Sequence, residues 1–258
     1  MKLAARRWPE TLVRGSPTVL LVHGITSSSR TWWRVAPVVA AAGWQVLAVD
    51  LRCHGASGCE PPTGMRDAAD DVAETLEAEL GSIRLDVAWG HSLGGRTVLQ
   101  LLNDHPAAAN RAVIEDPPGR LTGLDERAVT WSHEVDLARR DPLAFAAEQR
   151  EANPSWDERD ITENVASVAA CRIEPVMDAL AAGLSETAIE LAPGVRVPTL
   201  LVLARSGSGL PEPDRSETFA ALPDGSRLVE LAGGHTLHRD VPDAYLDTIL
   251  DWLGAPRH

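Results

Sequence analysis

The chain has 258 residues, which is enough for one sizeable hydrophobic core and near the upper end of a single domain. Its 44% hydrophobic and 24% charged residues are ordinary for a globular protein and exclude a mostly disordered or fibrous chain. The 37 acidic residues against 24 basic ones give a formal charge of -13, so nucleic acid and anionic membrane surfaces are unfavourable partners.

Cysteine usage and hydropathy indicate where the protein works. Cys53, Cys59 and Cys171 form an odd set without the spacing of a metal site, and the first ten residues lack the apolar run of a secretory signal. No stretch approaches the roughly 20 consecutive apolar residues of a membrane helix. We therefore expect a soluble protein of the reducing cytoplasm, without a metal. No pattern in the sequence predicts its oligomeric state.

Short apolar runs rich in β-forming residues alternate with longer helical patterns along the chain. Between the second and third of these runs, Ala69, Val72 and Leu76 recur at helical spacing and predict an amphipathic helix. Strands that alternate with helices form a parallel sheet covered on both faces. The sequence therefore predicts an α/β fold with a mostly parallel central sheet flanked by helices. The expected strands are residues 18–22, 45–50, 85–89, 112–114, 199–204 and 227–231.

The alternation stops between Pro117 and Pro198, where helical patterns continue without a convincing strand. Pro117-Pro118-Gly119 and Pro193-Gly194 lie at the two ends of this stretch, and both contain residues that break helices and mark chain reversals. We predict that residues 118–194 form a helical cap inserted into a core made of residues 1–117 and 195–258.

Residues 90–94 read Gly-His-Ser-Leu-Gly and contain the candidate nucleophile, Ser92. An apolar strand precedes this Gly-x-Ser-x-Gly pattern and a helical pattern follows it, which is the setting of a nucleophile elbow. The two glycines leave room for a tight, strained turn that raises the serine hydroxyl above the sheet. The alternative is that Ser92 only caps the following helix.

With this motif in place, the sequence resembles the α/β-hydrolase family over residues 18–111 and 197–253. Val22-His23-Gly24-Ile25 resembles the oxyanion loop of that family. Residues 50–57 resemble its Asp-x-Arg-Gly-His-Gly-x-Ser turn, with Cys53 in place of the usual glycine. The resemblance implies the serine-hydrolase branch with a cap and no cofactor, in which the backbone N–H groups of Ile25 and Leu93 form the oxyanion hole.

The candidate base follows the last predicted strand, in Gly233-Gly234-His235. The resemblance implies a catalytic histidine at this junction, and a serine nucleophile needs a neutral imidazole within hydrogen-bond reach. We therefore predict His235. His238 is the competitor, although its place beside Arg239 and Asp240 favours a solvated or ion-paired side chain.

The acid that should orient the histidine departs from the commonest pattern. Many relatives carry an aspartate just after the strand that here spans 199–204, but residues 205–209 read Arg-Ser-Gly-Ser-Gly. Because a base histidine without an acid loses its orientation, we expect the acid after the preceding strand, as in some branches of the family. Asp116 is preferred. Glu115 is an alternative, since a shift of one residue exchanges the facing of a strand end. Asp214 and Glu212 in a later loop are further alternatives.

A serine nucleophile favours acyl transfer through a covalent ester, so we predict cleavage of a carboxylic ester, lactone or thioester of a small, partly apolar molecule. Four tryptophans are expected in the substrate pocket: Trp32, Trp33, Trp131 and Trp156. Two other functions stay open. One is a cofactor-independent oxygenase or lyase-like enzyme that uses the same histidine and an acid after the earlier strand, and the other is a small-molecule receptor that retains the triad.

Overall fold

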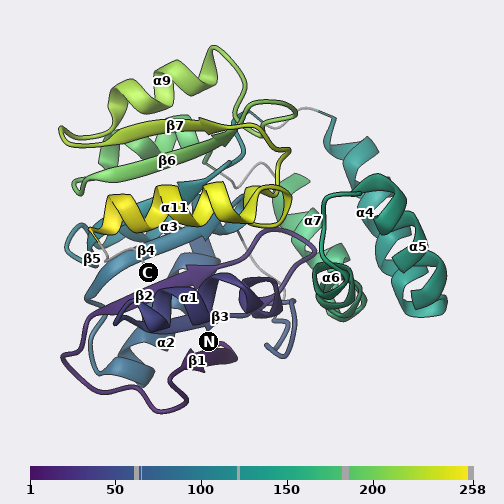
Figure 1. Ribbon diagram of the computed structural model, residues 1–258, viewed down its shortest axis with the longest axis horizontal. Coiled ribbons are helices and arrows are strands. Elements are labelled where there is room, and N and C mark those ends of the chain that lie inside the picture. The colour runs from purple at the N-terminus through teal and green to yellow at the C-terminus, as the bar shows by residue number, and fades with distance from the viewer. Residues whose placement is uncertain (61–63, 65, 121–122, 182–185, 255–258) are drawn as a thin grey trace.

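The computed structural model describes residues 1–60, 64, 66–120, 123–181 and 186–254. Its centre is a seven-stranded sheet with the strand order β1-β3-β2-β4-β5-β6-β7 (Figure 1). Among the described strands, β1 alone runs antiparallel to its neighbour, and the others are parallel. The strands are β1 (Ala5–Trp8), β2 (Thr18–Val22), β3 (Gln45–Val49), β4 (Leu85–His91), β5 (Ala109–Glu115), β6 (Thr199–Ala204) and β7 (Arg227–Leu231).

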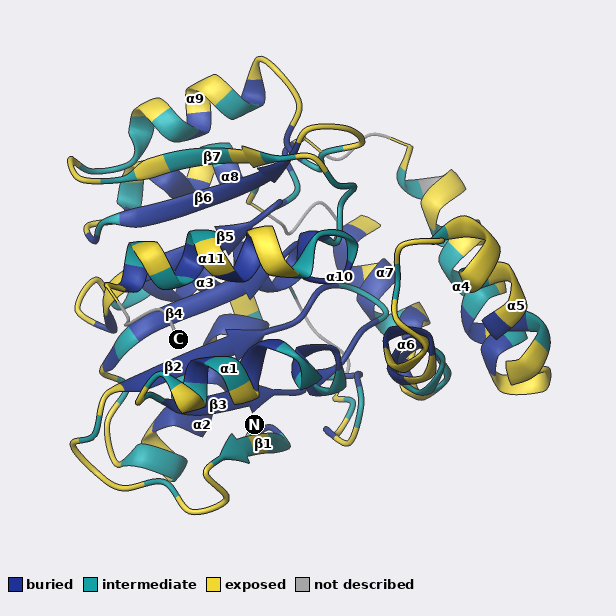
Figure 2. Ribbon diagram, in the orientation of Figure 1, coloured by how far each residue is buried: buried dark blue, intermediate teal, exposed yellow. Residues whose placement is uncertain are grey.

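Helices cover both faces of the sheet. On one face lie α1 (Val35–Ala41) and α11 (Pro242–Leu253), and on the other lie α2 (Arg66–Leu80) and α3 (Leu93–Asp104). Side chains along β2 alternate between the two layers, since Val19 and Leu21 pack with the first pair of helices and Leu20 and Val22 with the second. Figure 2 shows the resulting gradient, with buried central strands and more exposed edges.

Several short elements complete the core. They are η1 (Ser29–Trp33), α8 (Ala188–Leu191), η2 (Ala192–Gly194), α9 (Asp214–Ala221) and α10 (Leu237–Asp240). Helix α8 packs against α3 and α9, so the chain has already returned to the sheet before β6 begins.

Four helices between β5 and β6 stand together at one end of the sheet (Figure 1). Asp141 and Asp157 accept backbone hydrogen bonds at the N-termini of α5 and α6, which fixes where these two helices begin. Phe145 and Val168 join the hydrophobic core, so the group packs on the body of the protein through apolar side chains. The helices are α4 (Leu124–Arg140), α5 (Pro142–Ala152), α6 (Glu158–Ala170) and α7 (Ile173–Ala181), with no strand among the described residues between them.

The predicted α/β class with a mostly parallel sheet is confirmed, and each expected strand is present. Strand β1 was missed because Ala-Arg-Arg-Trp has no apolar alternation, and backbone pairing with β3 places it in the sheet. Strand β5 is longer than expected because the polar Asn110 and Arg111 continue it at the exposed end. Pairing with neighbouring strands therefore determined both the presence of β1 and the length of β5.

Cys53 and Cys59 form a disulfide, which the expectation of a reducing compartment did not anticipate. Cys53 has a φ of 64°, the left-handed conformation that the usual glycine of this turn adopts without strain. The location of the protein stays a prediction. No helix within the described ranges is both long and apolar enough to cross a membrane.

Candidate active site

The turn between β4 and α3 holds Ser92 in a backbone conformation of φ 51° and ψ -118°. The two flanking glycines make this turn possible. A Cβ on Gly90 would lie 2.2 Å from the Gly94 carbonyl oxygen, and a Cβ on Gly94 would lie 2.2 Å from the Val22 carbonyl oxygen. The Ser92 N–H donates to the Glu115 carbonyl oxygen at 2.8 Å, which ties the turn to the end of β5. The local sequence thus forms the strained elbow that the motif predicts.

Ser92, His235 and Asp116 are joined by hydrogen bonds at the carboxyl end of the sheet. His235 lies in the loop between β7 and α10, and its Nε2 lies 2.9 Å from Ser92 Oγ. Its Nδ1 lies 2.5 Å from Asp116 Oδ2, directly after β5. The three residues are far apart in the sequence but follow the ends of parallel strands, which meet at one edge of the sheet. The structure therefore brings together the three residues preferred from the sequence.

The Asp116 carboxylate is buried and fully engaged. Its Oδ1 accepts from the Ala204 N–H at 3.0 Å and from Ser208 Oγ at 2.6 Å, and its Oδ2 also accepts from the Gly209 N–H at 2.8 Å. Burial by itself raises the pKa of this carboxyl, but the hydrogen bonds from His235, Ser208 and Gly209 outweigh it and lower the pKa below its usual value. Asp116 is thus held as a carboxylate that faces the imidazole.

Glu115, the first alternative acid, faces the opposite side of β5. Its carboxylate accepts from the backbone N–H of His238 at 3.1 Å, from His238 Nδ1 at 2.9 Å and from the Tyr245 hydroxyl at 2.7 Å. Of the solvated or ion-paired side chain expected for His238, only the solvated one is wrong, because the residue is buried against Glu115. Glu115 thus has no hydrogen bond to His235 and is not the acid that orients its imidazole.

Asp214, the second alternative acid, belongs to a separate ion pair. It accepts from both the backbone and the guanidinium of Arg120, and the same guanidinium pairs with Glu217 at 3.2 Å. The carboxylate makes no hydrogen bond to His235. The loop after β6 thus contributes Ser208 and Gly209 to Asp116 and not an acid of its own.

The two candidate oxyanion residues, Ile25 and Leu93, line the same cavity as Ser92. Leu93 is the first residue of α3, where backbone N–H groups have no partner within the helix and favour a negative charge. His23 fixes the other loop: its Nδ1 donates to the Gly24 carbonyl at 2.7 Å and its Nε2 accepts from the Leu51 N–H at 2.9 Å. Burial lowers the pKa of His23, so the neutral form makes both bonds.

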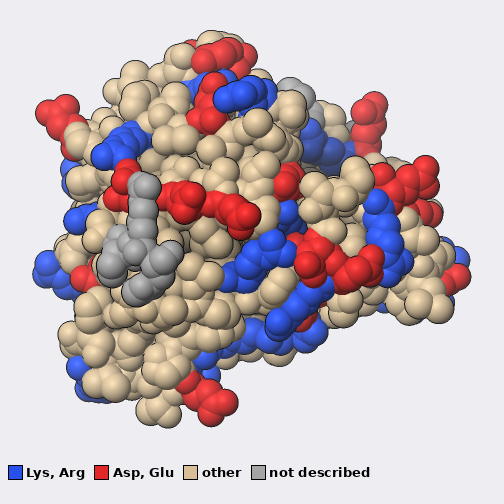
Figure 3. All heavy atoms as spheres, viewed as in Figure 1, with Lys and Arg blue, Asp and Glu red and all other residues tan. Residues whose placement is uncertain are grey.

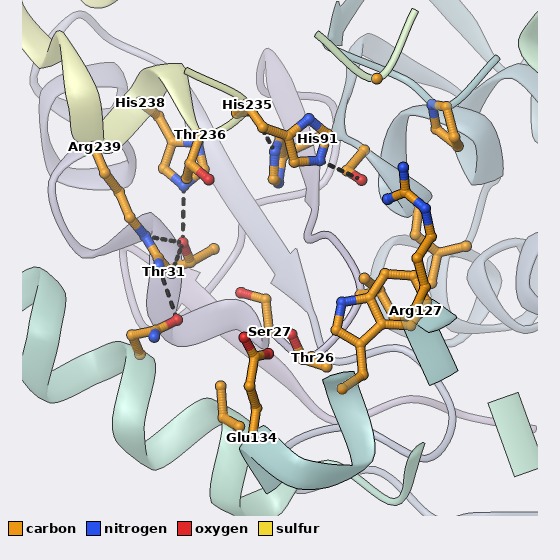
Figure 4. Close-up of a pocket in the computed structure, with 18 of the residues that line it drawn as sticks. Thr26, Ser27, Thr31, His91, Arg127, Glu134, His235, Thr236, His238 and Arg239 are labelled. Carbon is orange, nitrogen blue, oxygen red and sulfur yellow. Dashed lines mark hydrogen bonds between the residues drawn. The ribbon is translucent and has the colours of Figure 1, made fainter. Parts of the chain in front are cut away.

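A cavity of about 300 Å³ lies in front of Ser92, between the core and α4–α7. Figure 4 shows His91 and His235 on one side and Glu134 of α4 on the other, with its side chain pointing toward Ser27. A volume of this size suits a small molecule. The apolar part of the lining includes Ile25, Leu93, Trp131, Phe145, Trp156, Val168 and Leu180.

The predicted tryptophan pocket needs correction at two of its four members. Trp131 and Trp156 line the cavity, whereas Trp32 and Trp33 do not. Trp32 is fully buried, with its ring centroid 4.7 Å from that of His238. Trp33 donates from Nε1 to an α6 carboxylate at 2.8 Å, under two arginine side chains. The turn of η1 directs both rings away from the substrate side.

Several polar residues of the cavity were missed from the sequence, among them Thr31, Arg96, Arg127, Glu134 and Arg239. Arg96 had a usable signal, because it lies four residues after Ser92 on a predicted helix and must share its face. Thr31 and Arg239 had none, since they meet across 208 positions of sequence through a 2.6 Å hydrogen bond.

A family model described as alpha/beta hydrolase fold matches residues 17–176, which is more than half of the chain. The chain belongs to this family and is an alpha/beta hydrolase enzyme.

The relatives span several activities within the family. The chain is 25% identical to the sn-1-specific diacylglycerol lipase of Mus musculus, over 92% of this chain and 81% of that one. It is 26% identical to the N-formylmaleamate deformylase of Pseudomonas putida, over 92% and 89%. The crystal structure of the N-formylmaleamic acid deformylase from Pseudomonas putida S16 is similar to it with a TM-score of 0.78 and 20% identity, over 95% and 94% of the two chains.

Proposed function

We propose that this alpha/beta hydrolase is a serine hydrolase that cleaves a carboxylic ester, lactone or thioester of a small, partly apolar molecule through an acyl-enzyme on Ser92. The observation that carries the proposal is the continuous chain from Ser92 Oγ through His235 to Asp116, with distances of 2.9 and 2.5 Å. A nucleophile, a base and an acid in this order form the arrangement that activates a serine hydroxyl.

In the first half of the reaction, Ser92 Oγ attacks the carbonyl carbon of the substrate while His235 Nε2 takes its proton. Asp116 stabilises the imidazolium that forms, because its buried carboxylate is already oriented toward Nδ1. The carbonyl oxygen becomes negative and accepts hydrogen bonds from the backbone N–H groups of Ile25 and Leu93. Collapse of this intermediate breaks the bond to the leaving group, which departs with the proton held on His235.

In the second half, water enters and His235 removes a proton from it as it attacks the acyl-enzyme. The same two N–H groups stabilise the second oxyanion, and the carboxylic acid product leaves as the proton returns to Ser92 Oγ. No metal or organic cofactor takes part in this proposal.

Helices α4–α7 act as the proposed cap over this site. They contribute Trp131, Phe145 and Trp156 to the cavity, while the core contributes the reacting groups. Aromatic side chains facing a cavity of about 300 Å³ favour a small acyl compound with an apolar part. The lipase among the relatives acts on a diacylglycerol ester, which is consistent with acyl chemistry in this fold.

Covalent labelling tests the proposal before any substrate is known. A fluorophosphonate should modify Ser92 of the wild-type protein, and intact-protein and peptide mass spectrometry would locate the adduct. Labelling should fail in Ser92→Ala and fall sharply in His235→Ala. Unchanged labelling in His235→Ala, or an adduct on another residue, would show that Ser92 is not an activated nucleophile.

The oxygenase alternative predicts a different result. An enzyme that uses His235 and Asp116 for oxygen chemistry would consume dissolved oxygen with an aromatic substrate and would not show a burst with p-nitrophenyl esters. A stoichiometric p-nitrophenol burst that disappears in Ser92→Ala would exclude it.

A further inference from the structure

Arg96 is a buried cation beside the nucleophile that the proposed acyl transfer does not use. It lies on α3 four residues after Ser92, and its backbone N–H donates to the Ser92 carbonyl oxygen at 3.1 Å. Residues four apart share one face of a helix, one turn or about 5.4 Å along the axis. Only 3% of Arg96 is exposed, yet it lines the same cavity as Ser92 and His235.

The Arg96 guanidinium is only partly satisfied. Its Nε donates to the backbone carbonyl of Glu186. Its second terminal nitrogen, Nη2, is buried and has no hydrogen-bond partner within the described part of the chain. An unpaired buried donor on a charged group is costly, because it loses its water without a replacement. A cavity that holds such a group is suited to an anion.

The nearby carboxylates of Glu186 and Glu190 do not satisfy the unpaired donor of Arg96. Burial lowers the pKa of Arg96 to about 10, although the charges of Glu186 and Glu190 raise it. The guanidinium is therefore still protonated at neutral pH. Neither carboxylate makes a hydrogen bond or ion pair with it in the described structure, where its bond to Glu186 goes to the backbone.

The whole cavity is basic although the protein is acidic. Its lining contains four arginines and one carboxylate, Glu134, among the described residues, whereas the chain carries a net charge of -13. Many of the acidic side chains lie on the outside of the molecule, including a row over α11 in Figure 3. A positive cavity in a negative protein attracts small anions selectively.

The other three arginines of the lining differ in how far they are engaged. Arg120 pairs with two carboxylates of α9, and Arg239 donates to Thr31 and Asn164. Arg127, labelled in Figure 4, reaches the cavity from α4 and has no ion pair within the described ranges. Arg96 and Arg127 are thus the two guanidinium groups free to bind a ligand, one from the core and one from the proposed cap.

We propose that Arg96 binds a carboxylate group of the substrate, assisted by Arg127, so that the enzyme prefers small acyl compounds that carry a carboxylate. The proposal rests on the acyl transfer at Ser92 and adds the substrate class. The planar fork of arginine matches two carboxylate oxygens and fixes their orientation. Since Arg96 is one turn from Ser92, a short chain between the carboxylate and the reacting carbonyl fits best.

Two p-nitrophenyl esters of equal chain length test this preference: the hemisuccinate, which ends in a carboxylate, and the butyrate, which ends in a methyl group. Arg96→Met should lower kcat/KM for the hemisuccinate by about 10- to 100-fold and change kcat/KM for the butyrate by less than about threefold. Arg96→Lys should give a smaller loss on the hemisuccinate only. Equal losses on both esters, or no loss on either, would show that Arg96 only supports the fold.

The control is Arg84→Met, which removes the same charge from an exposed site before β4, at the opposite end of that strand from Ser92. It should leave the ratio of the two kcat/KM values unchanged. A shift of that ratio equal to the shift in Arg96→Met would reduce the effect to net charge and overturn the proposal.

Ligand binding separates this proposal from the one on which it rests. If the wild-type protein hydrolyses neither ester, the acyl-transfer proposal fails, but calorimetry with succinate still tests Arg96. Succinate should bind the wild-type protein more tightly than succinamide does, and the difference should fall by about 10-fold or more in Arg96→Met. Equal binding of the two compounds by the wild-type protein would overturn the carboxylate site whatever the catalytic result.

Discussion

Two neighbouring acids at the end of β5 each begin a series of hydrogen-bonded side chains, and the two series contain the same types of group. Asp116 continues through His235 to the Ser92 hydroxyl, with distances of 2.5 and 2.9 Å. Glu115 continues through His238 to the Thr31 hydroxyl, with distances of 2.9 and 2.8 Å. Each chain is an acid, an imidazole and a hydroxyl, yet only the first is proposed to be catalytic.

The surroundings of the hydroxyl separate the two chains. Ser92 precedes the N-terminus of α3, whereas the Thr31 oxygen accepts two hydrogen bonds from the Arg239 guanidinium, at 3.1 and 2.6 Å. A cation on the lone pairs makes an oxygen a poor nucleophile.

The histidines differ as well. The His235 side chain is 40% exposed, whereas the His238 side chain is 1% exposed. Burial lowers the pKa of His238 to about 3, so it would be a weak base. An acid, an imidazole and a hydroxyl in contact are therefore not sufficient for catalysis, because access and a site for the oxyanion are also required.

The sharpest way to break this comparison is to remove the Ser92 hydroxyl and, separately, to replace Thr31 by the smaller serine. Ser92→Ala should lower kcat for an activated ester by about 10⁶-fold, since the covalent route is lost. Thr31→Ser keeps the second hydroxyl and should change kcat by less than about threefold. Steady-state kinetics with a p-nitrophenyl ester measure both. If Thr31→Ser matched Ser92→Ala, the roles assigned to the two chains would be wrong.

The next comparison is between the acids. Asp116→Asn should lower kcat by up to about 10⁴-fold, because the imidazole loses its orientation and the partner of its charge. Glu115→Gln should retain most of the activity per folded molecule, and Asp214→Asn should do the same because its carboxylate pairs with Arg120. The three variants would be compared by kcat at equal folded concentration, measured by circular dichroism. A greater loss in Glu115→Gln than in Asp116→Asn would reverse the assignment.

The two acids, Glu115 and Asp116, should rank in the opposite order by their contribution to the free energy of unfolding. Glu115→Ala leaves His238 and Tyr245 buried without their acceptor and should lower the free energy of unfolding by about 3 to 5 kcal/mol. Asp116→Ala should cost less, because His235 and Gly209 line the cavity, where water can replace the carboxylate, and Ser208 Oγ has a second acceptor in the Leu210 carbonyl. Urea unfolding gives both values. An equal or larger loss in Asp116→Ala would mean that the second chain does not serve the fold.

The last expected effect concerns the pH dependence of stability in acid. Burial lowers the pKa of His54, His91 and His238 each to about 3, whereas the unfolded chain takes up these protons near pH 6.5. Their contribution to stability is therefore complete above pH 6.5 and is lost as the pH falls toward 3, by up to about 1.4 kcal/mol per pH unit for each histidine. Burial raises the pKa of Glu115, which acts in the opposite direction as the pH rises above 4.5.

His54→Asn isolates one of these contributions, because asparagine can still donate to the Arg52 carbonyl oxygen that His54 Nδ1 contacts at 2.8 Å. The slope of unfolding free energy against pH between 6 and 4 should become shallower by up to about 1.4 kcal/mol per pH unit. An unchanged slope would show that His54 is protonated in the folded protein.

The sequence by itself determined what is local. A strand, a Gly-x-Ser-x-Gly turn and a helix follow one another in adjacent residues, so Ser92 could be placed before its partners were known. His235 followed from its position after the last strand, and the parallel sheet followed from the alternation of apolar runs with helical patterns.

Tertiary structure decided what depends on facing and on distant partners. Whether Glu115 or Asp116 meets the imidazole depends on where β5 ends, and the backbone bonds from Ser92 to Glu115 and from Asp116 to Val202 set that point. The direction of Trp32 and the missing partner of Arg96 depend on the packing of segments far apart in sequence. Local patterns reflect chain geometry that every residue obeys, but the facing of one side chain is fixed only when the other elements have packed around it.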